Sequence, residues 1–197
     1  GTFVKALTEG SIMDPLAKLV EKRDPELLRA LAEVRMGLES WSAYLAGKRA
    51  TARDIAELRR LYYVMEKQAA KGGWDSEVDA EFHYAITAAS HNSLQMHVLD
   101  SIHSLFHTTI QVALMEFYQQ EGHVQLLLTQ HRDIMEAIAD HQPELARQKM
   151  MEHLDGREIY VRDTYAGADP TFQLPVRIIT ELAWRWAIRV RLVQVDV

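Results

Sequence analysis

Four side chains in this sequence have the types and the spacing of a divalent metal site: Asp79, His83, His131 and His153. Asp79 and His83 are four residues apart, so in a helix they share one face and can present an oxygen and a nitrogen to the same ion. Buried aspartate and histidine side chains need partners, because an unpaired buried polar group is costly. We therefore treat the four residues as one candidate site.

The other two histidines stand where helical periodicity predicts an apolar residue. His131 falls within an apolar stripe formed by Leu127, Ile134 and Ile138. His153 holds a similar inward position on the next helix. Because a turn of only two or three residues joins these two helices, we expect antiparallel neighbours that bring both imidazoles to a similar depth.

The elements that must position these residues are helices. The periodicity predicts an all-α fold, an antiparallel bundle of six to seven helices with a central metal or ligand pocket. Thr51 and Asp54 have the spacing of a capping box, which fixes the start of one helix. The expected helices span residues 15–21, 25–46, 52–71, 75–91, 94–118, 124–140 and 143–165.

The helix that begins at Pro25 has the clearest predicted buried face. Its apolar residues recur at alternating steps of four and three, as expected for one face of a helix. The residues predicted to be buried on that face are Leu27, Leu31, Val34, Leu38, Trp41 and Leu45.

Composition limits the possible functions. The 197 residues include no cysteine, so any metal must be held by histidine, carboxylate, amide or water. A net charge of −6 argues against a broad basic face that would grip nucleic acid. The sequence shows no apparent leader and no long uncharged apolar run, so we expect a cytoplasmic protein that does not enter a membrane.

Other interpretations of the polar residues remain open. Ser76 and Asp79 could form a capping box, and an interior histidine is often only a hydrogen-bonded core residue. His103 and His107 are a rival pair, again four residues apart, whose simpler explanation is a polar face or a pocket lining.

Arg35 also falls next to the predicted buried face, where a guanidinium needs an anionic partner. Glu39, four residues later, could form an ordinary surface pair with it. Alternatively, Arg35 could clamp the carboxylate of a ligand in a bidentate manner.

Several stretches of the chain, in order and spacing, resemble the C-terminal effector-binding (FCD) domain of FadR-subfamily regulators in the GntR family of transcription factors. About 150 residues are covered by this resemblance. The matching stretches are Asp14-Pro15-Leu16, the run from Glu33 to Glu39, Asp79 to His83, Ser90-His91-Asn92, His131 to Ile138, and Met150 to Leu154.

The resemblance implies that the four candidate residues hold a divalent ion. Zinc is the ion that we expect first, and nickel, manganese or iron would also suit these ligands. The resemblance also implies a small organic acid as effector, such as lactate, glycolate or pyruvate, bound by the ion, Arg35 and Asn92. Binding would then shift the helices of a homodimer and alter its grip on DNA.

The resemblance also suggests how the chain is divided. Residues 1–10 would be a remnant of the wing and linker of a winged-helix DNA-binding domain that is otherwise missing. Residues 14–166 would be the helical effector-binding domain, and residues 167–197 a tail of unknown structure. DNA would be bound through the missing domain and not through this segment.

Two alternative functions remain at this point. A metal-dependent hydrolase would need a general base beside the ion, and the helical spacing turns both Glu81 and Glu152 away from the candidate ligands. The metal could instead be purely structural and lock the bundle together.

Overall fold

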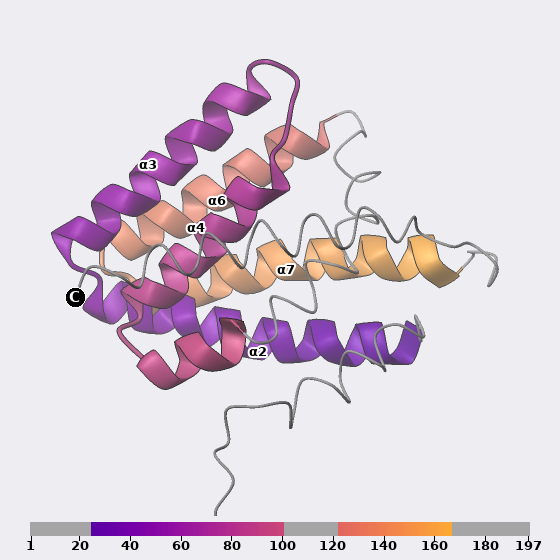
Figure 1. The fold of residues 1–197 in the computed structure, drawn as a ribbon, viewed down its shortest axis with the longest axis horizontal. Helices are drawn as coiled ribbons and strands as arrows, with labels where there is room; N and C mark the ends of the chain where they lie inside the picture. Colours follow the sequence, from indigo (N-terminus) through magenta and orange to yellow (C-terminus); the bar gives the residue numbers. More distant parts are fainter. Residues whose placement is uncertain (1–24, 101–121, 167–197) are drawn as a thin grey trace, which may run out of the picture.

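The computed structural model describes residues 25–100 and 122–166, and the secondary structure within these ranges is entirely helical (Figure 1). The all-α prediction is therefore confirmed. The expected helix at 15–21, the rest of the expected 94–118 helix with His103 and His107, and both chain ends lie outside the described residues. The helices are α2 (Pro25–Arg49), α3 (Ala52–Ala69), α4 (Ser76–Ala89), α6 (His123–Ala139) and α7 (Pro143–Ala166), with a further helical segment at residues 93–100.

The helices pack as a bundle in which α2 and α7 lie side by side (Figure 1). Helix α4 packs against both α2 and α3, and α6 packs against α2, α3 and α7. The end of α2 meets the start of α7 closely, because a Cβ added at Gly47 would lie 2.7 Å from the Cα of Pro143. Glycine is therefore needed at this crossing, and the two helices run in opposite directions.

Local backbone and capping contacts fix the start of α3 and the end of α6. Thr51 and Asp54 form the expected capping box at the start of α3. Helix α6 ends in a Schellman turn, in which His141 takes a positive φ of 53° and Gln142 N–H donates to the carbonyl of Ala137. The His141 ring also contacts the Gly47 carbonyl at 3.1 Å, which ties this turn to α2.

Apolar side chains from five helices form one core. The predicted apolar stripe on α6 is confirmed, since Ile134 and Ile138 are fully buried, and Phe82 and Ile86 of α4 are fully buried beside them. Within the described residues, no helix is long and apolar enough to cross a membrane.

The predicted buried face of α2 is wrong in its middle section. Val34 and Trp41 are 47% and 45% exposed, whereas Glu39 and Ser42 face the interior. The physical reason is that polar partners across the core satisfy these inward side chains, as when the Gln95 amide donates to Ser42 Oγ at 2.7 Å. Hydrophobic periodicity alone cannot reveal a helix face that is both polar and buried.

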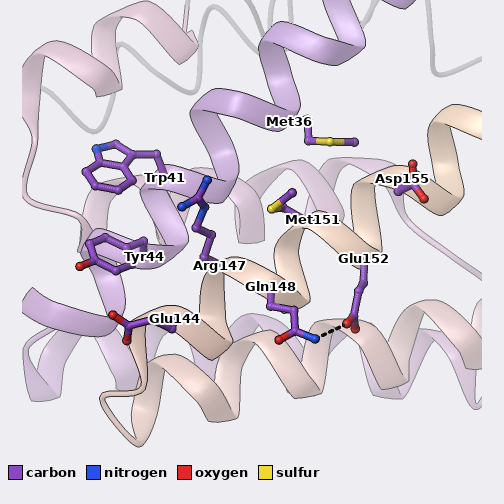
Figure 2. A pocket seen from close by; sticks show the side chains of 9 residues that line it. All are labelled: Met36, Trp41, Tyr44, Glu144, Arg147, Gln148, Met151, Glu152 and Asp155. Atoms are coloured by element: carbon purple, nitrogen blue, oxygen red, sulfur yellow. Dashed lines mark hydrogen bonds between the residues drawn. The ribbon is translucent and has the colours of Figure 1, made fainter.

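A surface pocket of about 660 Å³ lies between α2 and α7 (Figure 2). Trp41 and Tyr44 stack at one end of it, with ring centroids 4.7 Å apart. None of the four candidate metal ligands lines this pocket. Its lining consists of Met36, Trp41, Tyr44, Glu144, Arg147, Gln148, Met151, Glu152 and Asp155.

Candidate metal centre

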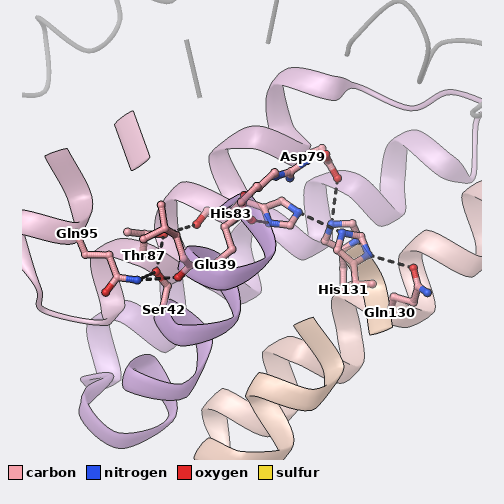
Figure 3. A network of polar contacts seen from close by, with 11 residues as sticks. Glu39, Ser42, Asp79, His83, Thr87, Gln95, Gln130 and His131 are labelled. Carbon is pink, nitrogen blue, oxygen red and sulfur yellow. Dashed lines mark hydrogen bonds and ion pairs between the residues drawn. The ribbon is translucent and has the colours of Figure 1, made fainter. Parts of the chain in front are cut away.

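The three candidate histidines converge in the core from three helices. Asp79 contacts this group at His131 (Figure 3). Asp79 and His83 lie on α4, His131 on α6 and His153 on α7. One nitrogen from each histidine lies within 4.8 Å of the others, and all three rings are at most 1% exposed. Asp79 is 6% exposed, and its Oδ1 lies 3.0 Å from His131 Nε2.

Asp79 does not cap its helix. The N-cap of α4 is Asp75, whose carboxylate accepts a hydrogen bond from Glu77 N–H. The capping-box alternative for Ser76 and Asp79 is therefore wrong, and the Asp79 carboxylate points at the histidine cluster instead.

The contact behind His131 fixes which of its nitrogens carries the proton. His131 Nδ1 lies 2.7 Å from the Leu127 carbonyl, which can only accept, so Nδ1 must donate. In the neutral ring, Nε2 then presents a lone pair toward the Asp79 carboxylate. Two acceptors thus face each other at 3.0 Å, an arrangement that calls for a proton or a cation between them.

The other two histidines follow the same pattern. His83 Nδ1 lies 2.6 Å from Glu39 Oε2, and His153 Nδ1 lies 3.0 Å from Gln130 Oε1. Because both neighbours are acceptors, we expect each neutral ring to carry its proton at Nδ1. Their Nε2 atoms are only 3.2 Å apart, and both present lone pairs. Three imidazole lone pairs therefore converge in a buried interior, and the Asp79 carboxylate lies beside that of His131.

A divalent ion suits this donor set. Histidine ligands of a metal generally donate their second ring N–H to a carboxylate, carbonyl or amide, which fixes the tautomer, and all three histidines here have such an acceptor beside Nδ1. Three nitrogens and one oxygen can hold zinc or a related divalent ion, and an ion with five or six ligands would keep one or two positions open.

Aromatic side chains pack against the His131 side of the cluster. Phe82 lies edge-on to His131 with centroids 5.0 Å apart, and Trp74 lies 5.6 Å from the same ring. His131 and His153 are themselves only 4.5 Å apart. The apolar surroundings limit the access of water, which strengthens interactions between the ligands and any bound ion.

Burial lowers the pKa of His83 to about 4, and the negative charge of Glu39 offsets this effect only in part. The ring is therefore neutral at pH 7, as a metal ligand must be.

The lowered pKa of His83 predicts that metal-free protein loses stability in acid. The unfolded chain takes up a proton at His83 near its ordinary pKa of 6.5, whereas the folded chain does so only near 4, so stability falls between these values. We expect the His83 contribution to decrease by about 2 kcal/mol from pH 7.5 to pH 5. Urea unfolding in the presence of a chelator measures this change.

His83→Asn is the matched control for this titration, because asparagine has no proton to gain in this range. The variant should lose less stability than the original chain between the same two pH values. Equal losses in both proteins would show that His83 does not titrate as its burial demands.

Arg35 lies at the edge of the cluster, where its side chain is 14% exposed. Its Nε donates to Glu39 Oε1, so the pair expected from the sequence does form. It is not an ordinary surface pair, because the Glu39 side chain is only 1% exposed.

Asn92 caps the helical segment at 93–100, where its Oδ1 accepts from Gln95 N–H at 3.2 Å. Its role toward a ligand stays a prediction.

The structure adds two residues that sequence reasoning did not assign to the site, Glu39 and Gln130. Glu39 was considered only as a partner of Arg35, because no spacing in the sequence links it to His83. Gln130 gave no signal beyond its position next to His131. Glu152 is exposed and bonds to Lys149 and Gln148, as expected for a residue that faces away from the cluster.

Comparison with known proteins places these residues in a family context. A family model described as the FCD domain matches residues 30–156. The HTH-type transcriptional regulator LutR of Bacillus subtilis (strain 168) is 30% identical over 161 residues, which cover 80% of this chain and 72% of LutR. The putative L-lactate dehydrogenase operon regulatory protein of Escherichia coli (strain K12) is 26% identical over 158 residues, which cover 78% of this chain and 60% of that protein.

A second similarity involves the C-terminal part of the chain. A phosphoenolpyruvate carboxykinase family model matches residues 128–194. The ATP-dependent enzyme of this name from Methylobacterium radiotolerans is 44% identical over 48 residues, which cover 24% of this chain but only 9% of the enzyme. So small a share of an enzyme carries no activity over to this chain.

Proposed function

Because this chain belongs to the FCD domain family and is the FCD domain of a GntR-type transcriptional regulator, we propose that it senses a small carboxylate through a bound divalent metal ion. The observation that carries the proposal is the convergence of three buried histidines, each with an acceptor beside its Nδ1, together with the Asp79 carboxylate beside His131 Nε2. The chain is part of a regulator and not an enzyme, so we discard the hydrolase alternative.

Small hydroxy and keto acids are the effectors that this chemistry favours. A divalent ion with open coordination positions can take the carboxylate and the neighbouring oxygen of lactate, glycolate or pyruvate. One similar protein is named as a putative regulator of an L-lactate dehydrogenase operon, which supports this class of acid. Zinc remains the ion that we propose first.

Arg35 is the proposed second grip on the acid. Its guanidinium lies at the margin of the cluster and its side chain is 14% exposed, so we expect an entering carboxylate to reach it. Asn92 is proposed as a further contact. Acid binding would shift the helices of a homodimer and alter DNA binding by a separate domain, in the cytoplasm where the DNA lies.

We expect acid binding to require both the metal and Arg35. Calorimetry of zinc-loaded protein should give heat with at least one acid from a panel of L-lactate, glycolate and pyruvate. Arg35→Gln should weaken that binding by roughly 10- to 100-fold, because one charge-assisted contact contributes about 1.5 to 3 kcal/mol. Acetate has the carboxylate but not the hydroxyl or keto oxygen on the neighbouring carbon, so it serves as the control ligand.

Absence of heat for every acid would contradict the sensor and favour a structural metal instead. A specific observation supports that second candidate, since the three histidines are almost completely buried. A structural ion would stabilise the bundle whether or not an acid is present.

A further inference from the structure

Glu39 links the proposed acid grip to the metal cluster. Its side chain is 1% exposed on the inner face of α2 and lies beside His83 (Figure 3), and it also pairs with Arg35. Glu39 Oε2 lies 2.6 Å from His83 Nδ1, and Oε1 accepts from Arg35 Nε. Each oxygen of the Glu39 carboxylate thus contacts a different neighbouring side chain.

Both neighbours can only donate at these atoms. The Nε of an arginine always carries hydrogen, and His83 Nδ1 must carry one if its Nε2 lone pair is to face the cluster. Two donors require two acceptor oxygens, which glutamate has. Glutamine at this position would offer only one oxygen, and its NH2 group would face a donor.

The acceptor behind His83 also differs in charge from the other two. His131 donates to a backbone carbonyl and His153 to the Gln130 amide, and both of these acceptors are neutral. A carboxylate acceptor makes the imidazole a stronger electron donor to a metal and holds its ring in place. The strength with which His83 would bind a metal therefore depends on the negative charge of Glu39.

We propose that Glu39 is a positioning residue for the metal, which fixes the tautomer and the ring orientation of His83 while Arg35 holds the carboxylate from its other side. This inference rests on the proposed metal site. It adds a chain of two contacts, Arg35 to Glu39 and Glu39 to His83, that connects the arginine proposed to bind the acid with a proposed ligand of the ion.

Glu39→Gln tests the proposal with zinc alone, so no effector is needed. We expect its Kd for Zn2+, measured by calorimetry on the full chain, to rise about 10- to 100-fold, the usual cost of losing a partner behind a ligand. Glu57→Gln is the matched control: Glu57 pairs with Arg60 on the exposed surface of α3, and this change should leave the Kd unaltered.

Cobalt spectroscopy separates positioning from a merely structural role. With Co2+ in the site, the visible absorption of Glu39→Gln should move toward that of His83→Ala, because a turned His83 no longer ligates. If Glu39→Gln does not fold, Glu39→Asp keeps the charge but withdraws it by one methylene, and the Zn2+ Kd should again rise.

Two results have distinct meanings. If the original chain fails to bind Zn2+, the proposed metal site itself is wrong. If it binds Zn2+ while a folded Glu39 variant retains a Kd within about twofold and an unchanged cobalt spectrum, the positioning role is overturned and the metal site stands.

Discussion

Replacement of His131 by alanine is expected to reduce zinc affinity by at least about 100-fold, because it removes one ligand outright, and even the partners behind ligands cost 10- to 100-fold. His131 is fully buried, and its Nε2 faces the Asp79 carboxylate at 3.0 Å. Competition with a chromophoric chelator measures the Kd.

His97→Ala is the matched control, since His97 is exposed on the helical segment at 93–100. Circular dichroism should show that both variants remain helical. Zinc affinity that is equal in the two variants would mean that the ion, if any, binds elsewhere on the chain.

Removal of the metal is expected to lower the melting temperature substantially. An ion that binds only the folded chain stabilises it by about 2.7 kcal/mol when its free concentration is 100 times its Kd. For a chain of 197 residues, this corresponds to a shift of roughly 5 to 10 °C. Thermal melts with and without excess zinc, after dialysis against a chelator, measure the shift.

The same melts on His131→Ala provide the control, because a chain without the site should gain little from zinc. Equal melting temperatures for the zinc-loaded and the metal-free original chain would contradict the site. The metal-free form is expected to be less stable for a structural reason. Without an ion, the Nε2 lone pairs of His83 and His153 repel each other at 3.2 Å.

Helix positions and the histidine cluster were largely predictable from sequence. The capping box at Thr51 and the turn before Pro143 are local signals, and the structure bears out both. His131 and His153 stood out because they interrupt apolar stripes, and such an interruption needs a tertiary reason. Short-range sequence patterns, namely capping signals and apolar stripes, were sufficient to predict these features.

The inner face of α2 was not predictable in the same way. Its orientation depends on polar partners from other helices, such as Gln95 for Ser42, and these pairings are not encoded in the spacing of one helix. The bulky side chains of Val34 and Trp41 suggested burial, but both are almost half exposed. Glu39 was missed for the same reason, because its partner His83 is distant in sequence.

The most direct test of the account is anomalous diffraction from crystals grown with zinc and L-lactate. We predict one strong anomalous peak within bonding distance of Nε2 of His83, His131 and His153 and of an Asp79 carboxylate oxygen, with lactate oxygens completing the ligand set. A peak elsewhere, or none among these four side chains, would contradict the central claim.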